Sequence, residues 1–316
     1  MRVATIDVGT NSILLLILDD EVEGGGRVLA DRCRIERLGQ GVDRTGSLDG
    51  AAVARALDAL REYAEIIREN RVDRVAAIGT QALREVDNGA AFLDPAAEIL
   101  GRPVEVVGGL REAELGFAAV MASFPEHRQG PVLVCDVGGG STELILGRDG
   151  RIETLVSLPI GSVRMAERHL KSNPPTAAEA AAMIGDLDRA IGRSELPNDL
   201  GPTPIVGLAG TVTTLAAVSL GLEPYDPDRV QGMRLSRAEI ERQLGLYLTL
   251  PLATRRQIRG LDPRRADVIA GGAAVVARIL ARFAPAQAGP LGPSVEMLVS
   301  DRGIRWGLAF ELIQSK

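Results

Sequence analysis

The chain has 316 residues, which favours two domains, and its 46% hydrophobic and 25% charged residues are typical of a globular protein. The net charge of −6 argues against a nucleic-acid polymer as partner, and no apolar run approaches the length of a membrane span. Two cysteines and two histidines exclude a disulfide framework and argue against a histidine-based metal cluster. Because Met1 leads straight into a strand pattern without a signal peptide, we expect a cytoplasmic protein with no membrane partner.

The first half of the chain opens with three consecutive strands, predicted at Val3–Asp7, Ile13–Leu18 and Arg27–Arg37. Ser47 precedes apolar residues at helical spacing and is expected to cap a long helix. The other elements expected in this half are loops at Glu21–Gly26 and Gly39–Gly46, the strand Val72–Ile78, a helix capped by Thr80 that carries Arg84, the helix Ala90–Leu100, the strand Val104–Val107 and the helix Arg111–Ala122.

The second half repeats this plan. Its expected elements are the strands Val132–Asp136, Thr142–Leu146 and Ile152–Ser157, a helix from Ser162 to Leu170, helices opened by capping boxes at Thr176 and Ser236, the strand Ile205–Leu208 with a helix after it, the long helix Ala266–Phe283, a loop at Pro285–Pro293, the strand Val295–Val299 and the helix Ile304–Gln314. Two such repeats predict two mixed α/β sheets covered by helices, with the main ligand cleft between the halves.

A short turn recurs in both halves. Asp7-Val8-Gly9-Thr10-Asn11-Ser12 and Asp136-Val137-Gly138-Gly139-Gly140-Ser141 each join two predicted strands. Backbone N–H groups of such turns can bind an anion, and an aspartate at the strand end can hold a cation against it. A single hairpin turn is a weak signal, but the repetition favours a pair of phosphate-binding loops over two ordinary hairpins.

Three further signals are weaker. The turn Gly207–Thr214 ends a strand and opens a helix, which suits an anion as well as it suits a plain strand–helix connection. Arg84 can bind phosphate, although most helical arginines are solvated. The arginines of the segment 255–265 are more readily explained as a solvated basic face than as a guide for an anionic chain.

A general base for attack by water would be a carboxylate near these loops. Glu112 stands in the first turn of a predicted helix, where a carboxylate is also favourable simply because of the helix dipole. On composition alone, Glu98, Glu105 and Glu114 are comparable candidates. The residues by themselves therefore leave the choice of base open.

Six segments, in order from residue 5 to about 307, resemble sequences of the exopolyphosphatase / guanosine-pentaphosphate phosphohydrolase (Ppx/GppA) family. They are Asp7–Ser12, Gly79–Glu85, Asp136–Leu144, Leu158–Arg164, Gly207–Thr214 and Ser300–Gly303. The resemblance implies two ribonuclease-H-like domains of the actin-like ATPase (ASKHA) superfamily, comprising residues 1–123 with the C-terminal helix at about 302–316, and residues 124–301. An active-site cleft would lie between the two domains.

The resemblance also implies hydrolysis of the terminal phosphate of inorganic polyphosphate, of pppGpp, or of both. The expected cofactor is Mg²⁺, with Mn²⁺ as the alternative cation, and the expected assembly is a homodimer. The family's catalytic glutamate precedes an alanine in a Gly-x-x-Glu-Ala motif and maps onto Glu112, and its phosphate-binding arginine maps onto Arg84. The expected phosphate-binding residues are Gly9, Thr10, Asn11, Ser12, Gly138, Gly139, Gly140, Ser141, Thr142, Gly210 and Thr211, and the expected metal ligands are Asp7, Asp136 and Glu143.

The chain departs from the family pattern beside the expected base. Leu110 and Arg111 stand where acidic residues are common, and Glu114 stands where arginine is frequent. The chain resembles the short, two-domain form of the family. Two other functions remain open, a kinase-like phosphotransferase of the same fold and a non-catalytic sensor that binds polyphosphate, pppGpp or ppGpp.

Overall fold

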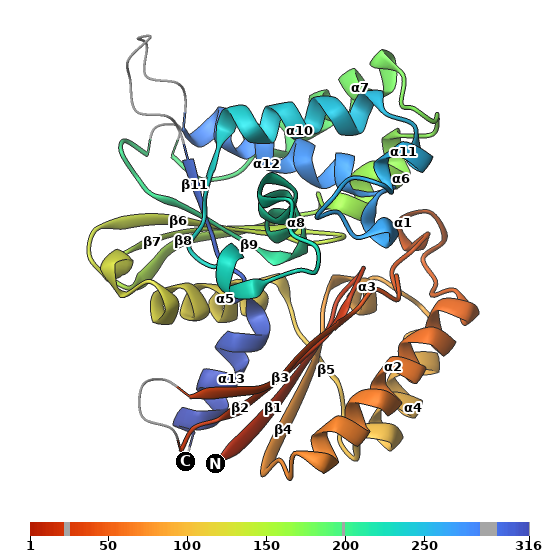
Figure 1. The fold of residues 1–316 in the computed structure, drawn as a ribbon, viewed down its shortest axis with the longest axis vertical. Helices are drawn as coiled ribbons and strands as arrows, with labels where there is room; N and C mark the ends of the chain where they lie inside the picture. Colours follow the sequence, from red (N-terminus) through yellow and green to blue (C-terminus); the bar gives the residue numbers. More distant parts are fainter. Residues whose placement is uncertain (22–25, 198–199, 285–295, 316) are drawn as a thin grey trace. The chain divides into compact units, whose positions relative to one another are not determined.

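The computed structural model describes residues 1–21, 26–197, 200–284 and 296–315. The chain divides into two compact units, each with its own sheet (Figure 1). Unit 1 comprises Met1–Ala119 and Ile304–Lys316, and unit 2 comprises Val120–Gly303. The boundaries predicted from the sequence lie at 123/124 and at about 301/302.

Unit 1 has a five-stranded sheet in the order β3-β2-β1-β4-β5. Its strands are β1 (Arg2–Val8), β2 (Ile13–Asp19), β3 (Arg27–Arg34), β4 (Arg74–Gly79) and β5 (Glu105–Val106), and its helices are α1 (Val42–Thr45), α2 (Gly50–Glu69), α3 (Gln81–Arg84), α4 (Ala90–Leu100), α5 (Gly109–Ser123, which runs past the boundary) and α13 (Ile304–Gln314). The first three strands pair antiparallel, while β4 pairs parallel with β1. Helices α2 and α4 pack together beside the sheet (Figure 1).

The two faces of β1 have different neighbours. Ala4 and Ile6 belong to the main core of unit 1, together with α2 and α4 residues. Val3 instead packs against Trp306 of α13, and the hydroxyl of Thr5 donates a 2.9 Å hydrogen bond to the carbonyl oxygen of Arg305. Since successive side chains of a strand alternate between faces, Asp7 lies on the α13 side of the sheet.

Unit 2 has a six-stranded sheet in the order β10-β11-β9-β6-β7-β8. Its strands are β6 (Pro131–Val137), β7 (Thr142–Arg148), β8 (Arg151–Leu158), β9 (Ile205–Leu208), β10 (Arg234–Ser236) and β11 (Glu296–Val299), and its helices are α6 (Ser162–His169), α7 (Ala177–Gly192), α8 (Ala209–Leu220), α9 (Pro227–Val230), α10 (Arg237–Thr249), α11 (Leu252–Arg255) and α12 (Ile269–Phe283), with 3-10 turns at Pro125–Arg128 and Pro263–Arg265. As in unit 1, three antiparallel strands precede a strand that pairs parallel with the first.

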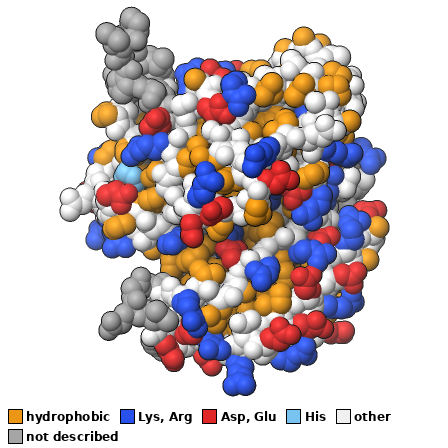
Figure 2. Space-filling view, viewed as in Figure 1, with side chains coloured by type: hydrophobic (Ala, Val, Ile, Leu, Met, Phe, Trp, Pro, Cys, Tyr) orange, Lys and Arg blue, Asp and Glu red, His pale blue; other side chains and the backbone are white. Residues whose placement is uncertain are grey.

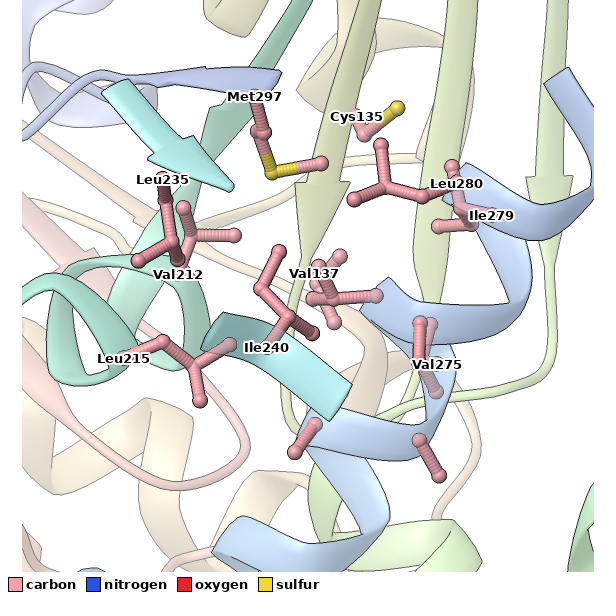
Figure 3. Close-up of a cluster of buried hydrophobic side chains, with 14 of the residues drawn as sticks. Cys135, Val137, Val212, Leu215, Leu235, Ile240, Val275, Ile279, Leu280 and Met297 are labelled. Atoms are coloured by element: carbon pink, nitrogen blue, oxygen red, sulfur yellow. The ribbon is translucent and has the colours of Figure 1, made fainter. Parts of the chain in front are cut away.

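The core of unit 2 lies directly under the second glycine turn. Cys135 and Val137, at the end of β6, are buried in one cluster with Val275 and Leu280 of α12 (Figure 3). Burying such a side chain stabilises the fold by about 1.5–3 kcal/mol. Because Cys135 and Val137 point into this cluster, Asp136 between them points to the opposite face of the sheet.

Most of the predicted elements are confirmed within one or two residues at each end. The helix Ala90–Leu100, the strand Ile205–Leu208 and the helix Ile304–Gln314 have the predicted bounds. The capping box at Thr176 is confirmed, because its hydroxyl accepts from Glu179 N and the Glu179 carboxylate accepts from Thr176 N. The predicted loop Pro285–Pro293 lies outside the described residues, as does most of the loop Glu21–Gly26.

Some predicted details are wrong. Helix α2 is capped by Asp49 and not by Ser47, since the Asp49 carboxylate accepts a 2.9 Å hydrogen bond from Ala52 N. Strand β3 ends at Arg34, three residues early, and Arg37 then adopts a left-handed φ of 57° that no strand tolerates. Strand β10 and the four-residue helices α1, α9 and α11 were not predicted.

No helix within the described part of the chain combines the length and apolarity that a membrane crossing requires. On the face drawn in Figure 2, basic and acidic side chains are interspersed rather than collected in one basic patch.

Candidate active site

The two hairpin turns have the same backbone hydrogen bond. Gly9 N donates to the carbonyl oxygen of Ser12 at 3.0 Å, and Gly138 N donates to that of Ser141 at 3.1 Å. In each turn, carbonyl oxygens are also taken by the segment that follows the third strand, as Thr10 O is by Gly39 N at 2.8 Å. With these carbonyl oxygens engaged elsewhere, the remaining N–H groups of the turn can face an anion without repulsion from them.

The first turn carries two polar side chains in different situations. The Thr10 hydroxyl donates a 3.3 Å hydrogen bond to Oε1 of Gln81, the first residue of α3. The carboxamide of Asn11 is buried, and neither its oxygen nor its nitrogen has a hydrogen-bond partner among the described residues. Because a buried amide without a partner is costly, Asn11 is the side chain of this turn most in need of a ligand.

The second turn is held against the start of α6. Val163 N donates to Gly139 O at 2.8 Å, and Ser162 N donates to Gly138 O at 2.9 Å. This contact requires glycine at position 161, since a Cβ there would lie 2.5 Å from the carbonyl oxygen of Gly139. The hydroxyl of Thr142 donates to Ile160 O at 2.5 Å, so its proton serves the fold rather than a ligand.

Asp7 is the buried carboxylate at the end of β1. Its Oδ1 has no hydrogen-bond partner among the described residues. Burial, together with the charge of Glu112, raises the pKa of Asp7 to about 7, although the charge of Arg305 opposes the rise. A buried carboxylate is not solvated by water, and a cation would compensate its negative charge. A carboxylate oxygen without a hydrogen-bond partner therefore fits a cation site.

Beside the second turn, a row of oxygen-bearing side chains crosses three neighbouring strands. Asp136 on β6 faces Glu143 on β7, and Glu143 faces Ser157 on β8. Both carboxylates are buried, and the Ser157 hydroxyl donates a 2.7 Å hydrogen bond to Glu143 Oε1. Such oxygen ligands suit a hard cation. Among the residues that the structure describes, however, no three His, Cys, Asp or Glu side chains are grouped closely enough to hold a metal ion by themselves.

Arg84 and Glu112 are brought together within unit 1. Nη1 of Arg84, at the end of α3, donates to Glu112 Oε1 and, at 2.6 Å, to the carbonyl oxygen of Val107. Glu112 is only 4% exposed, whereas Glu98, Glu105 and Glu114 are all exposed. Burial raises the pKa of Glu112, and the adjacent guanidinium of Arg84 opposes that rise. The structure therefore separates Glu112 from the other candidate bases.

Arg305 is a charged residue near Asp7 that the sequence analysis missed. It lies at the start of α13, is buried, and donates a 2.9 Å bond to Asp31 Oδ2 of β3. Its carbonyl oxygen accepts from Thr5, two residues before Asp7. Gln81, which accepts the hydrogen bond of the Thr10 hydroxyl, was also not predicted. The signal that could have found Arg305 is its place two residues after the matched segment Ser300–Gly303.

The third glycine turn opens α8. Ala209 has a left-handed φ of 68°, and the guanidinium of Arg265 packs directly on Gly210, where a Cβ would collide with it. Thr211 is buried in the first turn of the helix. The hydroxyl of Thr214 donates back to Gly210 O at 2.5 Å and is thus engaged within the helix.

The basic segment 255–265 is not a uniformly solvated face, and that prediction is wrong for its first arginine. Arg255 is 4% exposed, and burial lowers its pKa against the opposing charge of Asp267. Arg264 pairs with Asp262 at 2.8 Å. Arg256, Arg259 and Arg264 are exposed, as the prediction of a solvated face requires, and Arg265 is half-buried.

These features define a two-unit α/β protein with a duplicated hairpin turn and a buried carboxylate at the end of the first strand of each sheet. Residues 17–316 match the model of the Ppx/GppA phosphatase family, and the chain belongs to that family. The predicted fold class, two ribonuclease-H-like units of the actin-like ATPase superfamily, is confirmed.

Named relatives span the chain. It is 37% identical over 325 residues to "Exopolyphosphatase 2" of Mycobacterium tuberculosis, covering 98% of both chains. It is 30% identical over 313 residues to "Guanosine-5'-triphosphate,3'-diphosphate pyrophosphatase" of Vibrio parahaemolyticus, covering 98% of this chain and 59% of that protein. The solved structure of the Aquifex aeolicus Ppx/GppA family member is 33% identical, with a TM-score of 0.80, covering 100% of this chain and 98% of that one.

Proposed function

We propose that this protein is a phosphoanhydride hydrolase that releases the terminal phosphate of inorganic polyphosphate, of pppGpp, or of both. The observation that carries the proposal is the ion pair between the half-buried Arg84 and the buried Glu112. In this pair a guanidinium that can bind phosphate lies beside a carboxylate that can accept a proton. The names of the relatives support it, and the one covered along 98% of its length is an exopolyphosphatase. The Vibrio relative is matched over only 59% of its length, so its activity is the less direct support for this chain.

The chemistry is phosphoryl transfer to water. We propose that backbone N–H groups of the turns at residues 9–12 and 138–142, with those of Gly210 and Thr211, bind the phosphate chain. Arg84 then offsets charge on the transferred group. Glu112 accepts a proton as the water oxygen bonds to phosphorus, the bridging P–O bond breaks, and its electron pair stays with the shortened chain. The products are orthophosphate and a chain one phosphate shorter.

Asp7, Asp136 and Glu143 are the carboxylates that we propose hold the cation, Mg²⁺ or in its place Mn²⁺. The partnerless oxygen of Asp7 and the buried Asp136–Glu143 pair support this assignment. When bound, a divalent cation supplies positive charge near the phosphate oxygens. Magnesium commonly takes few protein ligands and completes its shell with water and phosphate oxygens, so a full protein cage is not needed.

The alternatives are less well supported. A kinase-like phosphotransferase or a non-catalytic sensor would use the same turns, but the named relatives are a polyphosphatase and a pyrophosphatase. The homodimer, the cytoplasmic location, the absence of nucleic-acid and membrane partners and the cleft between the two units stay predictions.

The test is release of phosphate from short polyphosphate, long polyphosphate, pppGpp and ATP, each with and without Mg²⁺. We expect cation-dependent release from at least one of the first three. The Glu112→Gln variant serves as the catalytically impaired control. Binding without release, or transfer of phosphate from ATP to a small acceptor, would contradict the proposal and favour the sensor or the phosphotransferase.

A further inference from the structure

One terminal nitrogen of the Arg84 guanidinium, Nη1, already uses both of its hydrogens in this structure. A terminal guanidinium nitrogen carries two hydrogens, and Nη1 of Arg84 uses them on Glu112 Oε1 and on Val107 O. The Val107 carbonyl belongs to the backbone between β5 and α5, whereas the Glu112 carboxylate is the end of a side chain and can rotate away. A phosphate oxygen that takes Nη1 must therefore displace the Glu112 carboxylate.

The two partners are not equally accessible. The side chain of Arg84 is 23% exposed, whereas that of Glu112 is 5% exposed. An incoming anion thus meets the guanidinium first, with the carboxylate behind it. A phosphate carries more charge than a carboxylate and offers several acceptor oxygens, which makes it the stronger competitor for a guanidinium.

We propose that the Arg84–Glu112 ion pair is a resting pair, and that the terminal phosphate of the substrate takes Arg84 over from Glu112. This inference rests on the proposed function and concerns how that same site is switched on. In the resting pair, Glu112 Oε1 accepts from Arg84, and the guanidinium charge makes the carboxylate a weaker base towards water. Transfer of Arg84 to the phosphate frees the carboxylate in the same event that delivers the substrate.

The electrostatics of the site favour this order of events. Burial raises the pKa of Glu112, and the guanidinium of Arg84 is the nearby cation that opposes the rise. When Arg84 moves to the phosphate, the pKa of Glu112 rises, and Glu112 becomes a stronger base while the substrate is bound. Without substrate, the guanidinium of Arg84 keeps Glu112 a weaker base, so Glu112 activates a nearby water less.

The exchange predicts an energetic coupling that simple neighbours would not show. If Glu112 competes with phosphate for Arg84, then deleting the carboxylate tightens phosphate binding, and it does so only while Arg84 is present. A double-mutant cycle isolates this term. The variants are Glu112→Ala, Arg84→Ala and the double variant, with Glu112→Gln as a second, more conservative change in case Glu112→Ala does not fold.

The measurement is the dissociation constant of tripolyphosphate by titration calorimetry on the full chain, in EDTA so that no turnover occurs. We expect Glu112→Ala to bind about tenfold more tightly than the unmodified protein, the effect of releasing one charge-assisted hydrogen bond. In the Arg84→Ala background, the same change should shift the constant by less than about twofold. Glu114→Ala is the matched control, since it removes an exposed carboxylate that pairs with Arg111, and should not change binding.

Two results would overturn the proposal. Equal tightening in both backgrounds would mean that Glu112 acts by repulsion through space and not by holding Arg84. Weaker binding in Glu112→Ala would mean that Glu112 positions Arg84 for phosphate instead of competing for it. The proposed function fails separately, if the unmodified protein releases no phosphate from polyphosphate or pppGpp, so the two failures are distinguishable.

Discussion

Asp136 and Glu143 face each other across the β6–β7 hairpin, whereas the residue that faces Asp7 across the β1–β2 hairpin is Leu14. The two turns are therefore alike in backbone but unequal in charge. The β6–β7 hairpin carries two facing carboxylates, whereas the β1–β2 hairpin carries one. For the proposed cation, the row of Asp136, Glu143 and Ser157 offers more oxygen ligands than the first turn does.

This inequality gives a prediction at Ser157. Its hydroxyl donates to Glu143 Oε1, and outer hydrogen bonds of this kind orient metal-binding carboxylates. The Ser157→Ala variant should lose about 10–100-fold in Mg²⁺ affinity or activity. Titration of phosphate release with Mg²⁺ measures the effect. Glu153→Gln, on the same strand in an exposed pair with Arg148, should behave like the unmodified protein.

Replacing the proposed base should slow the reaction without weakening binding. Glu112→Gln keeps the size of the side chain but cannot accept the proton, so kcat should fall by about 10²–10⁴. Steady-state phosphate release measures kcat and KM together. Turnover close to that of the unmodified protein would remove Glu112 from this role and return the choice to other carboxylates.

The pH dependence of the reaction follows from the environment of Glu112. A base works when deprotonated, and burial raises the pKa of Glu112 above its ordinary value of 4.5. Activity should therefore fall, as the pH is lowered, at a higher pH than an ordinary glutamate would dictate. Because Arg84 opposes the rise, Arg84→Ala should move this acidic limb to still higher pH. The pH profile of kcat/KM is the measurement, and an unmoved or lower limb in Arg84→Ala would contradict the assignment.

A pH effect on stability is expected at the capping box of α7. Hydrogen bonds from the backbone of Thr176, Lys171 and Ser172 lower the pKa of Glu179 to about 2. A carboxylate whose pKa is depressed in the folded state stabilises above its ordinary pKa, and that contribution is lost as the pH falls from about 4.5 towards 2. The denaturation midpoint of Glu179→Gln should lie below that of the unmodified protein at pH 7, and the difference should shrink at pH 3. A constant difference would show that the charge is not involved.

The strands and turns were predictable because their signals are local. Gly9 and Gly138 interrupt apolar runs, and the repeat of the pattern along the chain indicated two related units before any contact was known. The short helices α1, α9 and α11 have only four residues each, too few for an apolar period to show. Strand β10 is three residues long and depends on pairing with β11, which is 60 residues away in the sequence.

The candidate site was predictable in its backbone and less so in its charges. Glu112 could not be separated from Glu114 by composition, because only packing makes one buried and the other exposed. The contact of Arg305 with Thr5 joins residues 300 positions apart. The burial of Arg255 was hidden within a run of arginines that looked solvated, since burial depends on tertiary packing and not on the local run of charges.

The position of α13 has a consequence for biosynthesis. This helix covers Val3 and Leu18 of the first two strands and packs Arg305 beside Thr5, yet it follows all of unit 2 in the chain. On the ribosome, β1 emerges before all of unit 2, and its second face stays uncovered until α13 has been made. A nascent or prematurely terminated chain therefore exposes apolar strand surface that chaperones and proteases recognise. The Asp7 side of the sheet is completed only when synthesis has passed residue 314, so a truncated product should be degraded rather than partly active.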